Sequence, residues 1–410
     1  MELDARAPEA RRPLDTGRRP RLARSARQPV RGGREKLARN FVRRRRGPRG
    51  PRRRRGRDRT RDAPAPRDHS RVTLLAPPRD AWYIAAASSE VARRPVSRTI
   101  FDEPIVLFRD EDDRAVALVD RCLHRNMQLS AGRVVGGCLE CPYHGWRYDG
   151  AGRCVAIPSL DPGVRVALPE IPRYPTAECD GYVWVWMGRD EPGDPLRRFP
   201  HLGERGWTTF SMTTRFPAGA FACLENFLDC PHTVFVHRGW FRTRDPRQVR
   251  ARVQRHHDRV VAEFVDERPA RSVVRTLFFP AGTPLCHTDQ FVLPATSRVD
   301  YAFRTNRHFI ITSECTPVSE HETLVYTVIT FRYRRLGALV RLVFQPMARF
   351  IIRQDVAILG LQTSQLRRFG GARFTTVETD LFARGIRALW TAAADGRSAS
   401  PVSDDVTIRF

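Results

Sequence analysis

The chain has 410 residues, of which 41% are hydrophobic, so it is long enough for two or three domains and too apolar to be disordered throughout. Its formal net charge is +26 at pH 7, but residues 1–71 alone hold 26 basic and 8 acidic residues, a net charge of +18. The remaining 339 residues carry only +8, which excludes a uniformly basic nucleic-acid-binding protein and indicates a mildly basic body behind an arginine-rich leader.

The leader, residues 1–71, is rich in arginine and proline and contains a single aromatic residue, Phe41. Such a segment cannot bury enough apolar surface to offset its ordering entropy, so we expect it to be disordered. It has no apolar run after its positive charges and is not poor in acidic residues, so neither a secretory signal nor a mitochondrial transit peptide is predicted.

Three interpretations of the leader stay open. It is a misassigned start upstream of the true one near Val72, a solvated tail without function, or a tail that binds polyanions. Lys36 is the only lysine beside 70 arginines, which favours the first interpretation and a GC-rich bacterial source.

The rest of the chain predicts neither a membrane span nor a disulfide framework. No stretch approaches the ~18 uninterrupted apolar residues of a membrane-spanning helix. Nine cysteines spread over the body are too few for a small disulfide-rich secreted domain. We therefore expect a cytoplasmic protein with reduced thiols, some of which serve as metal ligands.

Residues 72–190 have the pattern of a small antiparallel β domain. Short apolar runs at 104–108, 115–119 and 182–186 are separated by polar turns. A stretch rich in proline and arginine, 190–200, follows as a linker.

Residues 201–395 mix strands with helices, and 396–410 are expected to be a C-terminal tail. An antiparallel sheet with helices packed on one face, an α+β fold, is the simplest architecture for this part. Strands are predicted at 272–279, 307–312 and 323–331, and a helix is predicted from Pro346, with apolar positions at Phe350, Ile351, Ile358 and Leu359.

Two short segments of the first domain each offer one thiolate and one imidazole, Cys122 with His124 and Cys141 with His144. A Rieske 2Fe–2S cluster needs this mixture, because one of its irons takes two thiolates and the other two imidazoles. Zinc stays open as an alternative, since Cys138 and Cys141 also form a C-x2-C pair. Cys138 itself is better explained as a small buried apolar residue.

Gly145-Trp146, Gly150 and Gly152 follow the second pair, and the whole segment resembles a Rieske protein. Respiratory Rieske subunits also brace these loops with a disulfide. The flanking positions here hold no cysteine, which disfavours a respiratory subunit; they are Arg125, Asn126, Pro142 and Tyr143.

A second constellation lies at 226–237, with the spacing N-x2-D-x2-H-x4-H. Its two histidines, His232 and His237, together with a distant carboxylate would form the facial triad of non-haem Fe(II) oxygenases. Residues five apart do not share one face of a regular helix, so we expect the helix to bend or end between them, with Pro231 contributing.

The carboxylate is expected from Asp355. On a helix its neighbours three and four positions away are all aliphatic, which would be costly for a carboxylate that is neither paired nor metal-bound. Asp380 is the alternative ligand.

Over about residues 80–395 the chain resembles the α-subunit of Rieske non-haem iron oxygenases, in the branch of the vanillate and dicamba demethylases and pheophorbide a oxygenase. The resemblance implies a Rieske domain followed by a helix-grip (START-like) catalytic domain, in a head-to-tail homotrimer. Asp229, beside Asn226, would link a cluster histidine of one subunit to an iron histidine of the next. The implied ligands are Cys122, His124, Cys141 and His144 for the 2Fe–2S cluster and His232, His237 and Asp355 for one mononuclear Fe(II).

The resemblance implies an oxygenase component that activates O2 and hydroxylates, demethylates or otherwise oxidises an aromatic or polycyclic substrate, as a monooxygenase or demethylase rather than a dihydroxylating dioxygenase. No G-x-G-x-x-G motif follows a predicted strand, so electrons should come from a separate NAD(P)H-dependent reductase, directly or through a ferredoxin. Two alternatives stay open: an electron-transfer Rieske protein without catalysis, and a polyanion-binding protein that uses the leader.

The remaining candidate residues are given structural roles. The adjacent pair His256 and His257 is expected at the surface, because neighbouring residues of a strand point apart. His287 and His308 are expected to be structural histidines, and Cys230 to serve packing.

Overall fold

The computed structural model describes residues 76–409, except 93, 162, 165, 194–195, 241–247, 266, 268–284, 304–306 and 334–335. The chain divides into two units, 1–65 and 66–410, and every described residue belongs to the second. The predicted disorder of the leader and the strand predicted at 272–279 lie outside the described residues. None of the described helices is long and apolar enough to cross a membrane.

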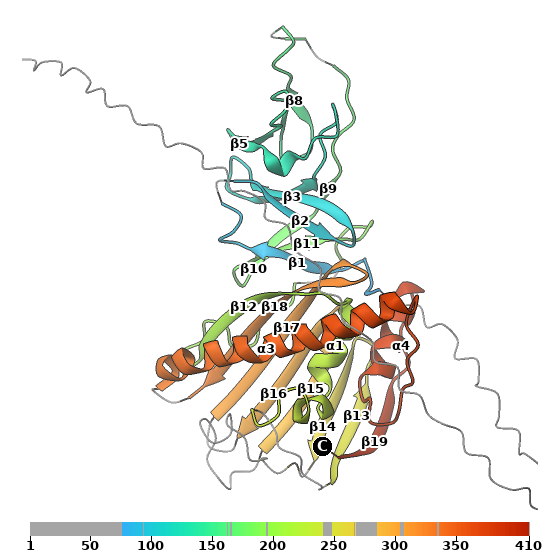
Figure 1. The fold of residues 1–410 in the computed structure, drawn as a ribbon. Coiled ribbons are helices and arrows are strands. Elements are labelled where there is room, and N and C mark those ends of the chain that lie inside the picture. Colours follow the sequence, from blue (N-terminus) through green and yellow to red (C-terminus); the bar gives the residue numbers. More distant parts are fainter. Residues whose placement is uncertain are drawn as a thin grey trace, which may run out of the picture. The chain divides into compact units, whose positions relative to one another are not determined.

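The N-terminal half of the described chain forms three small antiparallel sheets with the strand orders β1-β11-β10, β2-β3-β4-β9 and β5-β6-β7-β8 (Figure 1). The three apolar runs predicted as strands coincide with β3, β4 and β11. The strands are β1 (Trp82–Ala87), β2 (Val96–Ile100), β3 (Glu103–Arg109), β4 (Ala115–Val119), β5 (Arg133–Val135), β6 (Cys138–Glu140), β7 (Arg147–Tyr148), β8 (Cys154–Ala156), β9 (Arg173–Tyr174), β10 (Thr176–Cys179) and β11 (Tyr182–Trp186), with the 3-10 turn η1 (Leu129–Ala131).

The C-terminal half is built on one eight-stranded antiparallel sheet with the order β12-β18-β17-β16-β15-β14-β13-β19. Its strands alternate inward and outward side chains; in β14, for example, Val260, Ala262 and Phe264 are buried and their neighbours are less so. The strands are β12 (Thr208–Phe216), β13 (Gln248–Arg255), β14 (Arg259–Val265), β15 (Leu285–Val292), β16 (Thr296–Phe303), β17 (Arg307–Ser319), β18 (Glu322–Arg332) and β19 (Val402–Arg409).

Helices α1 (Ala220–Leu228), α3 (Gly337–Arg368) and α4 (Ala383–Ala394) lie against one face of this sheet (Figure 1). Helix α3 contacts mainly β12, α1 contacts β15 to β18, and α4 contacts β14. A 3-10 turn, η2 (Pro231–Val234), follows α1. The architecture confirms the predicted α+β class, with an antiparallel sheet covered by helices.

The long helix begins earlier than predicted. Helix α3 starts at Gly337 and Pro346 lies in its interior, although proline there removes one backbone hydrogen bond. The turns before it bury Phe344, whose ring lies 5.9 Å from that of Phe210 and 5.1 Å from that of Phe309. This aromatic packing holds the helix through the proline.

One further prediction about the C-terminal half was wrong. Residues 396–410 are not a free tail, because β19 pairs with β13 over its whole length and buries Ile408 at the edge of the sheet. The four apolar positions predicted for the long helix all lie in α3. Ile351 and Leu359 are buried against the sheet and α1, whereas Phe350 and Ile358 are exposed.

Candidate functional site

The two segments that hold Cys122 and Cys141 are loops, after β4 and between β6 and β7, and they share one backbone pattern. In each loop the cysteine carbonyl accepts a hydrogen bond from the backbone N–H of the residue four positions later. That residue has a positive φ, 58° for the asparagine of the first loop and 73° for the glycine of the second, and these residue types adopt such angles most readily. The cysteine N–H donates to the carbonyl five positions on. These partners are Asn126 and Met127 in the first loop and Gly145 and Trp146 in the second.

The loops bury the sulfur atoms and turn the imidazoles outward. Cys122 and Cys141 are 1% and 2% exposed and belong to the core of the N-terminal half, whereas His124 is half-buried and His144 exposed. The two imidazole centroids lie 4.5 Å apart, and the ring of His124 stacks on Trp146 at 4.7 Å. Two inner thiolates and two outer imidazoles are the arrangement that a Rieske cluster requires.

One orphaned atom supports the fit of a cluster to these loops. The Nδ1 atom of His124 is buried and has no hydrogen-bond partner among the described residues. Buried polar atoms are nearly always paired, so a ligand bond to a metal is a reasonable partner for this nitrogen. Cys122 and Cys141 are both free of disulfides, which leaves their sulfur atoms available as thiolates.

A tyrosine touches the first of these sulfur atoms. The hydroxyl of Tyr148 accepts from the N–H of Leu123 at 3.3 Å and lies 3.1 Å from Cys122 Sγ. A thiolate sulfur can only accept, so the phenol would donate to the sulfur when Cys122 is a metal ligand. Burial raises the pKa of Tyr148, which keeps the phenol protonated.

Tyr148→Phe is expected to lower the reduction potential of the bound cluster by on the order of 50 mV, because a hydrogen bond to a thiolate favours the reduced, more negative state. Redox titration followed by visible absorbance would measure it. Tyr174→Phe, which removes a phenol bonded to Glu103 instead, should leave the potential unchanged. Equal potentials for wild type and Tyr148→Phe would contradict the expectation.

The second constellation lies where α1 ends. Helix α1 stops at Leu228, earlier than predicted, with Asp229 as its extended C-cap. The turn η2 then carries His232 and ends at Val234, so His237 follows on a separate turn. Because the α-helix is already broken before Pro231, the five-residue spacing places no strain on a regular helix.

The structure brings both histidines onto the carboxylate predicted from the distant helix. Asp355 Oδ1 lies 3.6 Å from His232 Nε2 and 3.0 Å from His237 Nε2, and one ligand atom from each residue lies within 4.8 Å of the others. Asp355 is 5% exposed and sits in α3 beside Ile352, on the face turned to the cavity. Asp380 lies elsewhere: its carboxylate accepts the Val377 N–H.

The hydrogen bonds of the two imidazoles fit a metal ion between these three groups. His237 Nδ1 lies 2.8 Å from Gln354 Oε1, and His232 Nδ1 is bonded to the backbone carbonyl of Asp229. If each Nδ1–H donates to its oxygen, each Nε2 carries a lone pair aimed at the carboxylate. Asp355 Oδ1 is buried without a hydrogen bond among the described residues, so a cation bound by two imidazoles and one carboxylate satisfies all three, as in a facial triad.

The structure adds two details to this second constellation. Gln354 orients His237, and its position beside Asp355 was the available signal. Asp229 orients the His232 ring through its main-chain carbonyl, while its carboxylate Oδ2 accepts the His232 N–H at 3.2 Å. The Asp229 side chain is 36% exposed, and Asn226 Oδ1 is buried without a described partner.

A cavity of about 120 Å³ adjoins the triad and has the sheet as its floor. Three hydroxyls stand directly opposite one another across β16, β17 and β18, and those of Ser313 and Thr327 are 3.0 Å apart. The next row of the sheet is apolar except for Asp289. The floor residues of these two rows are Ser297, Ser313 and Thr327, then Asp289, Val299, Ile311 and Ile329.

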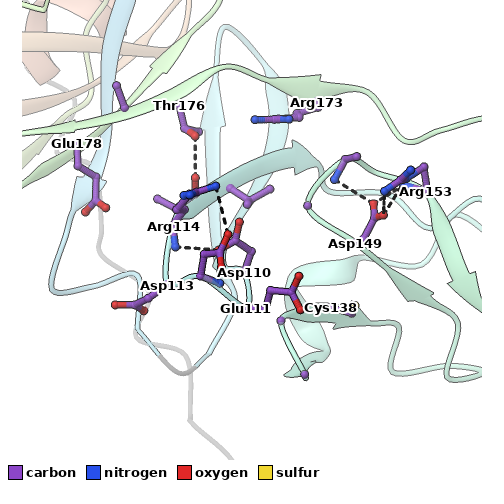
Figure 2. A pocket seen from close by; sticks show the side chains of 18 residues that line it. Asp110, Glu111, Asp113, Arg114, Cys138, Asp149, Arg153, Arg173, Thr176 and Glu178 are labelled. Carbon is purple, nitrogen blue, oxygen red and sulfur yellow. Dashed lines mark hydrogen bonds and ion pairs between the residues drawn. The ribbon is translucent and has the colours of Figure 1, made fainter.

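A larger hollow of about 570 Å³ lies on the N-terminal half (Figure 2). Two of its aspartates serve local turns: Asp149 pairs with Arg153, and Asp110 accepts the backbone N–H of Arg114 (Figure 2). Cys138, the residue of the alternative zinc pair, lines this hollow and is half-buried. None of the predicted metal ligands is among its described lining residues.

The other histidines have the structural roles that were predicted for them, and Cys230 makes one contact that was not predicted. His256 and His257 are exposed, and His308 is bonded to Asp300. His287 is buried between two carboxylates, and Cys230, expected only to pack, also lies 3.4 Å from Asp289.

Comparison with known proteins identifies both halves. Residues 81–175 match the model of the Rieske [2Fe-2S] domain, and residues 216–396 match that of the vanillate O-demethylase oxygenase C-terminal domain. The oxygenase component of dicamba O-demethylase from Stenotrophomonas maltophilia is 37% identical over 163 residues, which is 39% of this chain and 48% of that protein. Aminopyrrolnitrin oxygenase PrnD from Pseudomonas fluorescens is 37% identical over 171 residues, 38% of this chain and 45% of that protein.

The matches thus span about half the length of these curated relatives. Among solved structures, dicamba monooxygenase bound to dicamba superposes with a TM-score of 0.65 at 24% identity, over 77% of this chain and 98% of that one, which shows a common fold. Because a Rieske [2Fe-2S] domain is followed in one chain by an oxygenase C-terminal domain of this type, the chain belongs to the Rieske non-haem iron oxygenases.

Proposed function

We propose that this chain is the oxygenase component of a cytoplasmic Rieske oxygenase system and oxidises a small aromatic or polycyclic substrate with O2. The observation that carries the proposal is the convergence of His232, His237 and Asp355 on one point beside a largely apolar cavity. An electron-transfer protein would have no use for a cavity at such a site. A polyanion-binding protein would have no use for either donor set.

The residues of the site divide the work between holding, orienting and excluding water. His232, His237 and Asp355 would hold Fe(II) from one side, and the bound iron would supply the reductive activation of dioxygen. Gln354 fixes the ring of His237 through Nδ1. Val299, Ile311 and Ile329 keep the adjoining space apolar, while the hydroxyl row beside them can orient a polar group of the substrate.

Electrons are proposed to enter through the cluster held by Cys122, His124, Cys141 and His144, reloaded by a separate NAD(P)H-dependent reductase, directly or through a ferredoxin. Asp229 is proposed to carry the connection to the iron site. Its carboxylate borders both the substrate cavity and an outer pocket of about 240 Å³ between α1, α3 and the segment before α4. In a head-to-tail homotrimer, this outer pocket would receive the cluster histidines of a neighbouring subunit.

We propose a monooxygenase or demethylase reaction rather than dihydroxylation. The names of the relatives support it, since dicamba O-demethylase and the toluene-4-sulfonate monooxygenase subunits of Comamonas testosteroni are among them.

Incubation with NADH, a surrogate reductase and ferredoxin, 18O2 and a panel of methoxylated and methylated aromatics tests the function. We expect at least one panel member to be converted, with one atom of 18O in the hydroxylated product or in released formaldehyde. In the His237→Ala protein the surrogate reductase should reduce the cluster as in the wild type, and no product should form. The electron-transfer alternative would be established by two results together. The wild-type protein would hold iron and accept electrons but convert no panel member, and His237→Ala would pass electrons to an external acceptor as well as the wild type does.

A further inference from the structure

The floor of the substrate cavity carries one buried carboxylate that the iron site does not use. Asp289 lies on β15 in the apolar row of the sheet, directly opposite Val299, and lines the cavity together with the triad. It is 2% exposed. A buried carboxylate costs several kcal/mol unless it is paired, so its partners define what it is for.

The first partner is a histidine that is fixed from four sides. The ring of His287 is stacked between Phe264 at 4.2 Å and Tyr301 at 4.3 Å, which face it in register from β14 and β16. Its Nδ1 lies 2.6 Å from Glu267 Oε2 and its Nε2 lies 2.9 Å from Asp289 Oδ1.

Both ring nitrogens therefore face carboxylate oxygens, and both can donate only if the imidazole is protonated. The two carboxylates raise the pKa of His287 to about 9 against the opposing effect of burial, in agreement with an imidazolium. Asp289 Oδ1 is thus engaged, and its carboxylate plane is held by a rigid ring.

The second oxygen of Asp289 is much less well paired. Its partner among the described residues is the thiol of Cys230, 3.4 Å away, and a thiol is a weak donor. An ionised carboxylate can accept about four hydrogen bonds, so acceptor capacity remains on Oδ2. The neighbours of Asp289 on the cavity floor, Val299 and Ile311, offer no donor.

We propose that Asp289 is the residue that selects the substrate: it accepts a hydrogen bond from an N–H group of an otherwise apolar molecule and disfavours molecules that carry a carboxylate. The inference rests on the proposed function and names the substrate class of the same cavity. An amine would supply Oδ2 with a donor that its apolar neighbours on the cavity floor do not offer. A carboxylate placed there would meet a like charge held in position by His287.

Three probes of nearly equal size separate these effects: 3-methoxyaniline, 3-methoxytoluene, which lacks the donor, and 3-methoxybenzoate. Binding to the anaerobic holoenzyme is measured by isothermal titration calorimetry, which requires no turnover. We expect the amine to bind about 10- to 100-fold more tightly than the toluene, the range of one hydrogen bond to a charged group, and the benzoate to bind most weakly. Hydrophobicity alone would rank the toluene first.

Asp289→Asn should reduce the preference for the amine about tenfold and relieve the exclusion of the benzoate, because a charge-assisted hydrogen bond becomes a neutral one. Asp300→Asn is the matched control. Asp300 is another histidine-paired aspartate of the same sheet, bonded to His308 and Arg298, and it is not among the described lining residues of the cavity. Its variant should keep the wild-type ranking.

Equal binding of amine and toluene, tightest binding of the benzoate, or an unchanged ranking in Asp289→Asn would overturn the inference. So would a stoichiometric divalent metal that Asp289→Asn loses and His232→Ala retains, because Cys230, His287 and Asp289 would then be metal ligands. If Asp289→Asn does not fold, the wild-type ranking decides. If the probes are converted but the amine does not bind most tightly, the proposed function stands and this inference fails. If the amine binds most tightly but no probe is converted, this inference stands and the proposed function fails.

Discussion

His232→Ala is expected to remove the mononuclear iron and leave the 2Fe–2S cluster in place, whereas Cys122→Ser should abolish the cluster. The donor sets lie in separate cores, the first around Cys122 and Tyr148 and the second between α1, η2 and α3. Loss of one ligand should therefore empty its own site alone. Iron and acid-labile sulfide analysis, with visible and electron paramagnetic resonance spectra, should show one cluster and one further iron per wild-type chain and no turnover in either variant.

The control for this pair is His257→Ala, which removes an exposed histidine and should change neither metal. Stoichiometric zinc without labile sulfide in the wild-type protein would contradict the Rieske assignment of the first site. Retention of the mononuclear iron in His232→Ala would remove His232 from the second.

Asp229→Asn should leave both metal sites filled and the cluster reducible, while product formation falls by at least about 100-fold. The substitution keeps the shape of the side chain and the main-chain carbonyl that holds the His232 ring. It removes the negative charge from a carboxylate that borders both the substrate cavity and the outer pocket. The proposed electron path to the iron site therefore loses its connecting group.

Two measurements separate this role from a structural one. Rapid-mixing experiments follow the reduction of the cluster by the partner reductase and then the oxidation of the reduced cluster by O2 with substrate present. In Asp229→Asn only the oxidation step should be slower than in the wild type. Asp380→Asn is the control. Asp380 lines the same outer pocket and its carboxylate accepts the Val377 N–H, and its variant should behave as the wild type does. Near-normal turnover in Asp229→Asn with both metals present would mean that Asp229 only caps the end of α1.

The cluster loops and the histidines of the iron site could be predicted from the sequence because each is local. Cys122 and His124 lie in one tight loop, and so do Cys141 and His144, so their spacing alone indicates the chemistry. His232 and His237 likewise lie in one short segment, although the helix ends at Leu228 and not between them as the sequence predicts. The α+β class was predictable for the same reason, since strand and helix periodicity are local properties.

Asp355 is an intermediate case. The aliphatic neighbours on its helix indicated that the carboxylate needs a partner, but its distance from the histidines along the chain left Asp380 as an alternative. The packing of α3 against α1 and β12 places Asp355 beside the two histidines, whereas Asp380 does not lie with them.

The remaining features depend on contacts between residues far apart in the sequence. Phe344 is anchored by aromatic rings of the sheet, which carries α3 through Pro346 against its local propensity. Strand β19 carries a short alternating pattern at Val406 and Ile408, but its partner β13 is distant in the sequence, so only the tertiary structure supplies the pairing. His287 and Asp289 acquire their partners from β14, β16 and the link between α1 and η2. Strand register places Phe264 and Tyr301 beside His287. The end of α1 places Cys230 beside Asp289. The sequence by itself therefore predicted the donor residues of two metal sites, whereas only the tertiary structure decided what lines the adjoining cavity, since register and packing bring those side chains together.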